Sequence, residues 1–180
     1  KKTVAYIQEK YPEIVTIADA KRADIGNTNA GYVKAIFDEL KFEAVTVNPY
    51  FGREALQPFL DQKDKGIIVL CKTSNPGSGE FQDGLWPKVA ANVAKNWNAN
   101  NNCLLVVGAT FPEELSQVRE IVGEMTLLVP GIGVQGGDVA KTVKAGLNSN
   151  HAGMIINSSR GIIFADNPRL ETQKLRDEIN

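Results

Sequence analysis

Short apolar runs rich in β-branched residues alternate along the chain with segments whose apolar residues recur at helical spacing. The runs are almost continuously apolar, which is typical of parallel strands covered on both faces. They predict strands at Ile14–Ala18, Ala44–Asn48, Gly66–Cys71, Cys103–Val107, Thr126–Val129 and Gly153–Asn157. The intervening segments predict helices at Asn29–Leu40, Arg53–Asp61, Leu85–Ala99, Glu113–Val122 and Val139–Ala145.

This alternation indicates an α/β protein with a parallel sheet. The units recur at roughly the thirty-residue spacing of a βαβ unit. A closed (β/α)8 barrel needs about 250 residues, so six units form either an open doubly wound sheet or a barrel without two of its units. No repeat or interdomain linker interrupts the pattern, and we expect residues 1–180 to form a single domain.

Composition narrows the class of protein further. The chain has 180 residues, of which 43% are apolar and 23% charged, with a net charge of −1, so neither nucleic acid nor an anionic membrane is expected as its main partner. No apolar run approaches the roughly 18 residues of a membrane helix. Cys71 and Cys103 lie in strand-like runs without CxxC spacing, which predicts buried free thiols in a reducing, cytoplasmic environment. The single histidine, His151, lies in a polar loop, so a metal site is not expected.

The six residues that follow the first apolar run include Asp19, Lys21 and Asp24. Asp19 and Lys21 are two residues apart, so on a regular strand they share one face with Ile17. Asp24 falls beyond the strand, in the turn before the next helix. A strand-end salt bridge is the simplest interpretation. The density of charge also suits a lysine held between carboxylates, which can stabilise a carbanion and deliver a proton to it.

A glycine-rich turn follows the fifth predicted strand. Gly131, Gly133 and Gly136 form a literal GxGxxG, which is one signature of a dinucleotide site. Arg160, after the next strand, could bind the phosphate of NADP, so an NADP site stays an open interpretation. That fingerprint normally lies in the first βα unit, whereas this turn lies near the end of the chain. The alternative is a phosphate-monoester site in which Gln135 and Arg160 assist the turn.

Barrel enzymes typically bind phosphate after strands seven and eight. If the glycine-rich turn and Arg160 follow those two strands, the first predicted strand is strand three. The sequence therefore predicts a (β/α)8 TIM barrel with strands 3–8 present and the first two βα units missing from this chain.

The motifs together resemble those of the orotidine 5'-monophosphate decarboxylases, especially their longer bacterial branch. The first motif, Asp19–Thr28 (DAKRADIGNT), is similar to the family signature DxKxxDIxNT. The other motifs follow in the family's order and extend the resemblance over essentially the whole chain: TVNPY at 46–50, TSNPGSG at 73–79, VGAT at 107–110 and PGIGVQGG at 130–137.

The resemblance assigns roles to the charged residues. Lys21 matches the lysine that protonates C6 of the pyrimidine after carbon dioxide leaves, and Asp19 matches the carboxylate beside the substrate's own carboxylate. Asp24 and Thr28 match residues that reach across a homodimer interface into the neighbouring site. The resemblance therefore implies a homodimer with shared active sites.

The remaining roles concern the pyrimidine ring and the phosphate. Ser74 matches a serine that hydrogen-bonds the ring, while Gln135 and Arg160 match phosphate ligands. The chain departs from many members in carrying Ser159, where they have glycine before the arginine. The family's first-strand aspartate and second-strand lysine have no counterpart, and because missing strands would leave sheet edges open, we expect a longer molecule.

The implied reaction converts orotidine 5'-monophosphate to uridine 5'-monophosphate and carbon dioxide, the last step of de novo pyrimidine nucleotide synthesis. It is a carbon–carbon lyase reaction that the family performs without a cofactor or a metal. Three alternatives stay open: a magnesium-dependent sugar-phosphate decarboxylase of the same superfamily, a non-catalytic nucleotide-phosphate-binding remnant, and an NADP-dependent oxidoreductase.

Overall fold

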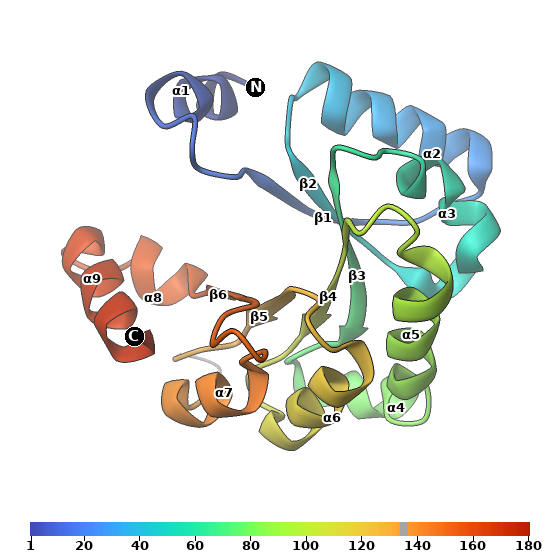
Figure 1. Cartoon of the computed structure of the whole chain (residues 1–180). Coiled ribbons are helices and arrows are strands. Elements are labelled where there is room, and N and C mark those ends of the chain that lie inside the picture. The colour runs from blue at the N-terminus through green and yellow to red at the C-terminus, as the bar shows by residue number, and fades with distance from the viewer. Residues whose placement is uncertain (134–136) are drawn as a thin grey trace. The chain divides into compact units, whose positions relative to one another are not determined.

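The computed structural model describes residues 1–133 and 137–180 (Figure 1). Its strands run in sequence order, β1-β2-β3-β4-β5-β6, and are parallel in the pairs β1–β2, β2–β3, β4–β5 and β5–β6. The parallel α/β class predicted from the hydrophobic pattern is therefore confirmed. The bounds are β1 Ile17–Arg22, β2 Ala44–Val47, β3 Gly66–Lys72, β4 Cys103–Val107, β5 Leu127–Pro130 and β6 Met154–Asn157.

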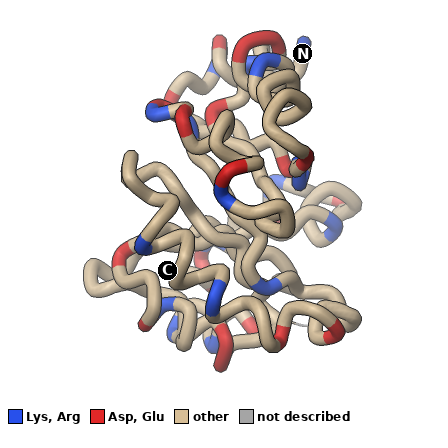
Figure 2. The backbone as a smooth tube through the Cα atoms, turned by 90° about the vertical axis from the view of Figure 1, so that its right-hand side faces the viewer, with Lys and Arg blue, Asp and Glu red and all other residues tan. Residues whose placement is uncertain are grey.

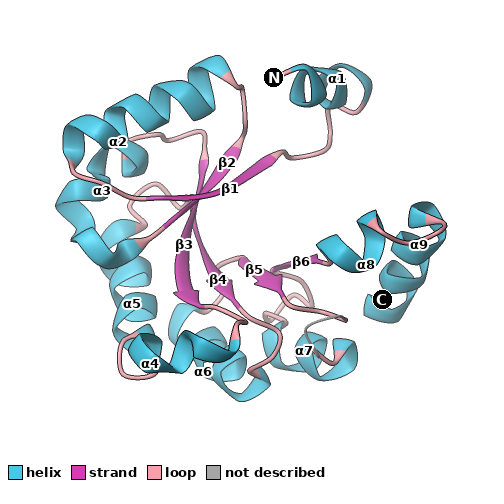
Figure 3. Cartoon of the chain, turned by 180° about the vertical axis from the view of Figure 1, so that it is seen from behind, coloured by secondary structure: helices cyan, strands magenta, loops and turns pink. Residues whose placement is uncertain are grey.

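Helices follow the strands, as Figure 3 shows by colour. Two long helical segments end in π-helical turns, at Lys34–Glu39 and Val93–Trp97, and two short 3-10 turns occur at Pro49–Phe51 and Pro76–Ser78. The α-helices are α1 Lys2–Lys10, α2 Gly26–Val33, α3 Gly52–Leu60, α4 Gly79–Gln82, α5 Trp86–Asn92, α6 Pro112–Val122, α7 Val139–Gly146, α8 Ser159–Ile163 and α9 Pro168–Ile179.

Local sequence accounts for the start and the end of several helices. Pro112 stands in the first turn of α6, where its missing N–H is not needed, and Gly123 follows the last turn with a φ of +58°. Asp138 caps α7 by accepting a hydrogen bond from the Lys141 N–H at 2.8 Å. These starts agree to within one residue with the helices predicted at Glu113–Val122 and Val139–Ala145.

The chain forms two compact units. Unit 1 comprises residues 1–70 and 92–104, and unit 2 comprises residues 71–91 and 105–180. Lysine and arginine segments are interspersed with aspartate and glutamate segments along the tube in Figure 2, in keeping with the net charge of −1.

The core of unit 1 lies between its strands and α2 and α3. Val45, Val47, Leu56, Phe59 and Ile67 are completely buried there, and burying one such side chain stabilises the fold by about 1.5–3 kcal/mol. The buried Asn29 amide of α2 links the turn before α2 to helix α3, since its Nδ2 donates to the carbonyl oxygens of Asp24 and Ala55, both at 2.6 Å.

Unit 2 has its own core under α6 and α7, which lie side by side in Figure 3. Arg119 of α6 fastens the loops around β5 and β6, because its guanidinium donates to the carbonyl oxygens of Gly123, Met125, Gly146 and Gly153. Its partial burial lowers the pKa of this guanidinium. The fully buried apolar residues of this core include Leu105, Leu115, Val118, Leu127 and Val129.

Each unit also contains one of the two cysteines. Cys71 and Cys103 are both buried and free, which confirms the prediction from their apolar surroundings. Burial raises the pKa of Cys71 to about 12 and the pKa of Cys103 to about 11. Over the described residues, we find no helix with the length and the apolar character that crossing a membrane requires.

The predicted bounds of the first strand were wrong. The strand begins at Ile17 rather than Ile14, since Ile14 and Val15 are 52% and 61% exposed and make no strand pairing. It then continues through the charged residues to Arg22, beyond the predicted end at Ala18. The apolar run therefore marked the neighbourhood of the strand, whereas pairing with β2 fixed its bounds.

Helices α8 and α9 were missing from the predicted pattern. Neither has a buried residue, and α9 is strongly polar along its length, so no apolar stripe announces it in the sequence. The helix predicted at Asn29–Leu40 begins earlier, at Gly26, directly after the charged motif.

Candidate functional site

The carboxyl end of β1 in unit 1 carries the acid and the base singled out from the sequence. The Lys21 ammonium lies 2.5 Å from Asp19 Oδ1, and both side chains are well exposed, at 49% and 62%. An exposed ion pair of this kind adds little to stability. Such a pair can, however, hold an ammonium, one kind of proton donor, at an accessible strand end.

The backbone that brings this pair together is irregular, which corrects the argument from strand alternation. Ala18 pairs with Val45 and Arg22 with Val47, so four steps along β1 match only two along β2. Lys21 has a φ of +47°, in the left-handed region that non-glycine residues rarely adopt. The pair therefore forms across a bulge rather than on one face of a regular strand.

Asp24 and Thr28 lie beyond this bulge. Asp24 stands in the turn before α2, where its Oδ1 accepts the Ile25 N–H at 2.7 Å, and Thr28 is exposed in the first turn of α2. The placement of Asp24 outside the strand agrees with the sequence analysis.

In unit 2, packing against its own neighbours fixes the backbone at Ser74. The Thr110 hydroxyl donates to the Ser74 carbonyl oxygen at 3.2 Å, and the Gly108 N–H donates to the Lys72 carbonyl oxygen at 2.8 Å. A Cβ added at Gly108 would lie 2.7 Å from Ser74 Cα and 2.8 Å from its N and Cβ. The VGAT motif therefore supplies a close-packed platform for Ser74.

The loop that begins at Ser74 is closed by side chains that the sequence analysis missed. The Lys72 ammonium, 1% exposed, forms an ion pair with Asp83 and lies 4.5 Å from the centre of the Phe111 ring. The Gln82 side chain accepts the Thr73 N–H at 2.8 Å. A lysine at the very end of a buried strand was the available signal, because lysine is almost never fully buried unless it is paired.

The glycine-rich turn of unit 2 has the backbone that only glycine adopts readily. Gly131 and Gly133 have φ values of +103° and +77°, and a Cβ at Gly137 would lie 2.7 Å from the Gly131 carbonyl oxygen. The Gly137 N–H donates to that same oxygen at 3.1 Å. Gln135 and Gly136 lie outside the described residues.

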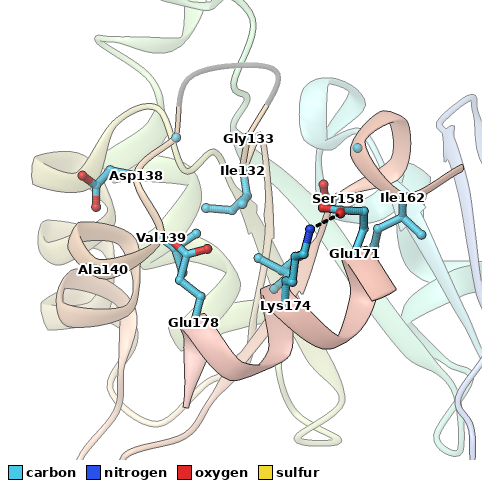
Figure 4. A pocket seen from close by; sticks show the side chains of 13 residues that line it. Ile132, Gly133, Asp138, Val139, Ala140, Ser158, Ile162, Glu171, Lys174 and Glu178 are labelled. Carbon is cyan, nitrogen blue, oxygen red and sulfur yellow. Dashed lines mark hydrogen bonds and ion pairs between the residues drawn. The ribbon is translucent and has the colours of Figure 1, made fainter. Parts of the chain in front are cut away.

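A pocket of about 580 Å³ opens beside this turn, and Figure 4 shows its lining. Asp138, Glu171 and Glu178 contribute carboxylates, while the Lys174 ammonium is 2.6 Å from Glu171. An excess of acidic groups does not favour an anion, so we do not assign a phosphate to this pocket. Its other lining residues are Ile132, Gly133, Gly137, Val139, Ala140, Ser158, Gly161, Ile162 and Leu175.

Arg160 lies next to that pocket in sequence but does not line it. It is exposed in the first turn of α8, directly after Ser159, whose hydroxyl accepts a hydrogen bond from Asn157 Nδ2 at 3.4 Å. Within residues 1–133 and 137–180, its guanidinium makes no ion pair or side-chain hydrogen bond, so its five donors are available to a ligand.

Comparison with known proteins identifies the family of this chain. The sequence profile of the family described as "Orotidine 5'-phosphate decarboxylase / HUMPS family" matches residues 1–175. The chain is 50% identical over 189 aligned positions to the orotidine 5'-phosphate decarboxylase of Janthinobacterium sp. (strain Marseille), covering 98% of this chain and 70% of that protein. It is 48% identical to the one from Aromatoleum aromaticum, covering 90% of this chain and 62% of that protein.

Solved structures show the same likeness. The chain is 41% identical to Leishmania donovani UMP synthase, with a TM-score of 0.93, covering 99% of this chain and 42% of that one. For Leishmania donovani OMP decarboxylase the TM-score is 0.91 at 40% identity, and the match covers 98% of this chain and 72% of that one. The profile match and the identities show that the chain belongs to the orotidine 5'-phosphate decarboxylase / HUMPS family.

Proposed function

We propose that the protein decarboxylates orotidine 5'-monophosphate to uridine 5'-monophosphate, acting as a carbon–carbon lyase in pyrimidine nucleotide synthesis. The observation that carries this proposal is the Lys21 ammonium held 2.5 Å from Asp19 at the end of β1. The relatives named as orotidine 5'-phosphate decarboxylases support the same reaction. Because the chain spans between 62% and 70% of the length of these two relatives, activity of the whole protein is part of the proposal.

In the proposed reaction the bond between C6 and the substrate carboxylate breaks, and its electron pair stays on C6 while carbon dioxide leaves. Lys21 then donates a proton to C6, which gives the product, and regains a proton from solvent. The pyrimidine offers no electron sink comparable to a cofactor, so stabilisation comes from charge placed before the reaction begins. Asp19 keeps the ammonium in place and faces the substrate carboxylate, whose repulsion is relieved as carbon dioxide departs.

Arg160 is proposed to bind the 5'-phosphate together with Gln135, and Ser74 to bind the pyrimidine. The exposed guanidinium of Arg160 supports its role, because a planar fork of donors matches phosphate oxygens in a bidentate manner. Binding energy from the phosphate, remote from the reacting carbon, can then be used in the transition state. We further propose that the fold is a (β/α)8 barrel in which β1 to β6 correspond to strands three to eight.

We also propose a homodimer in which Asp24 and Thr28 reach the neighbouring site, and a cytoplasmic location in keeping with the two free thiols. Three large apolar side chains at the ends of β1 and β2 support an interface there. Ile25, Tyr50 and Phe51 are 62%, 82% and 54% exposed, and the rings of Tyr50 and Phe51 pack edge to face with their centres 6.1 Å apart. Exposed apolar patches often mark a contact surface.

Mixing two inactive chains tests the shared site. Asp24→Asn and Lys21→Ala homodimers should both be nearly inactive. A heterodimer would combine both lesions in one site and leave the other site intact, so activity should recover toward half of one wild-type dimer. Heterodimers that form without recovering activity would place Asp24 in the site of its own chain.

Turnover after exhaustive chelation tests the reaction itself. The purified protein is treated with EDTA, and loss of orotidine 5'-monophosphate is followed by absorbance. We expect full activity, because the proposed mechanism assigns charge stabilisation to Lys21. Activity that is lost on chelation and restored by magnesium would favour the sugar-phosphate branch of the superfamily, while no turnover under any condition would favour a nucleotide-binding remnant.

A further inference from the structure

Thr46 is a polar residue in the middle of β2, and its side chain is completely buried. The strand around it is otherwise apolar, with Ala44, Val45 and Val47. Buried hydroxyl groups are nearly always hydrogen-bonded, since leaving one without a partner costs about 1–3 kcal/mol. The partners of this hydroxyl are the two residues of the charged pair on β1.

The first partner is the backbone of Lys21, whose N–H donates to Thr46 Oγ1 at 2.9 Å. The register of β1 and β2 breaks between Ala18 and Arg22, so in this bulge the threonine hydroxyl takes the place of a strand carbonyl as the acceptor. Regular pairing resumes directly afterwards, where the Asn48 N–H donates to the Arg22 carbonyl oxygen at 2.9 Å.

This bond acts on a strained residue. Lys21 has a φ of +47°, and a non-glycine residue in such a conformation persists only when its surroundings hold it there. The direction in which the lysine side chain leaves the backbone depends on that φ. A hydrogen bond to the Lys21 N–H therefore helps to set where the ammonium is presented.

The second partner is the Asp19 carboxylate. The hydroxyl has a single proton, and because its oxygen accepts from Lys21 N–H, the proton is available to Asp19 Oδ1, which lies 2.9 Å from Thr46 Oγ1. The same Oδ1 accepts from the Lys21 ammonium at 2.5 Å. Four groups from three residues form a closed ring: the Lys21 backbone N–H, the Thr46 hydroxyl, the Asp19 carboxylate and the Lys21 ammonium.

We infer that Thr46 is a positioning residue for the decarboxylation, fixing both the backbone of Lys21 and the carboxylate that holds its ammonium. This inference rests on the proposed function, since it takes Lys21 as the proton donor. Thr46 is buried, and its hydroxyl is hydrogen-bonded to the Lys21 N–H and to Asp19. Its loss should therefore lower kcat much more than it changes KM.

Three substitutions test the role. Thr46→Val keeps the shape of the side chain and removes the hydroxyl, and we expect kcat to fall by about 10- to 100-fold, the size of a lost hydrogen bond to a charged group. Thr46→Ser keeps the hydroxyl and should restore most of kcat. The matched control is Thr16→Val, because Thr16 is also a buried threonine of unit 1 whose hydroxyl donates to a carboxylate, that of Glu43, at 3.2 Å.

A second measurement separates this role from turnover. Hydrogen exchange at the Lys21 amide should be slow in the wild type and in Thr46→Ser, and at least about tenfold faster in Thr46→Val, because the amide loses its acceptor. Thr16→Val should leave it unchanged. If the wild type does not decarboxylate orotidine 5'-monophosphate, the proposed function fails, and this exchange rate still decides whether Thr46 holds Lys21.

Two results would overturn the inference. One is a Thr46→Val protein in which a measured property, either the kcat of an active wild type or the exchange rate of the Lys21 amide, stays at the wild-type value. The other is an equal fall in kcat for Thr46→Val and Thr16→Val, which would reduce the hydroxyl to a general contribution to folding.

Discussion

The charged end of β1 in unit 1 and the arginine at the start of α8 in unit 2 are held very differently. Lys21 is fixed at both ends, by Thr46 at its backbone and by Asp19 at its ammonium. Arg160 is exposed, and over the part of the chain that the structure describes its guanidinium has no ion pair or side-chain hydrogen bond. The residue proposed to react is held by the protein's own groups, whereas the residue proposed to bind phosphate is not.

The roles proposed for the two residues, proton donor for Lys21 and phosphate binder for Arg160, account for this difference. A proton donor lowers the barrier only if its charge is oriented before the reaction, because reorganisation during the reaction would cost energy. A residue that binds phosphate contributes binding energy, and the bound phosphate can itself order the guanidinium. Changes at the end of β1 should therefore act on kcat, and changes at Arg160 on KM.

The largest effect should come from Lys21→Ala. Removing the proton donor should lower kcat by about 10²- to 10⁴-fold, the usual contribution of a positioned general acid, while product-like nucleotides still bind. Steady-state kinetics and a titration with uridine 5'-monophosphate measure the two properties. Lys34→Ala, at an exposed lysine of the same unit, is the control. Near wild-type turnover of Lys21→Ala would remove Lys21 from the mechanism.

A smaller effect is expected from Gly108→Ala in unit 2. The added Cβ would lie 2.7–2.8 Å from Ser74 backbone atoms, so the loop must shift, which typically costs about 1–3 kcal/mol of stability. We expect a lower midpoint of denaturation and weaker nucleotide binding. Gly84→Ala is the matched control, because nothing lies within 4 Å of its added Cβ. Equal effects of the two substitutions would show that Ser74 does not depend on this platform.

The effect that should touch activity least concerns one buried thiol in each unit. Because burial raises the pKa of Cys71 to about 12 and that of Cys103 to about 11, the folded protein keeps both protonated after the unfolded chain begins to ionise near pH 9. The stability that the two protonated thiols contribute to the folded protein is therefore fully present below about pH 9. It falls at higher pH by up to about 1.4 kcal/mol per pH unit for each thiol.

Denaturation curves between pH 8 and 11 measure this loss, with the Cys71→Ala, Cys103→Ala double variant as reference for other groups. Thiol labelling of the folded protein at pH 8 reports the two units separately, and both cysteines should be protected. Rapid labelling of one of them in folded protein would show that its unit opens independently.

The sequence was sufficient to predict the parallel α/β class and the starts of α6 and α7, because near-continuous apolar runs and Pro or Asp at helix starts are local signals. It also indicated that Asp19 and Lys21 would meet, two residues apart on one segment. It did not reveal the bulge, since the register of β1 depends on Thr46 of another strand.

The other features that were missed have the same cause. The ion pair of Lys72 and Asp83 joins residues eleven positions apart across a loop, and nothing in either neighbourhood names the partner. Helices α8 and α9 bury no residue, so the periodicity that predicts a helix from its core-facing stripe is absent. Polar residues in otherwise apolar strands, such as Thr46, were the signal that could have been used.

The different roles proposed for Lys21 and Arg160 can be tested most directly with two substrates and two variants. Orotidine 5'-monophosphate and orotidine without its phosphate are compared as substrates for wild type, Lys21→Ala and Arg160→Ala. We expect Lys21→Ala to lose turnover of both substrates. Arg160→Ala should raise KM for the nucleotide by about 10- to 100-fold, the size of lost hydrogen bonds to a charged group, and leave turnover of orotidine unchanged. An equal loss on both substrates for Arg160→Ala, or turnover of orotidine by Lys21→Ala at the wild-type rate, would contradict the account.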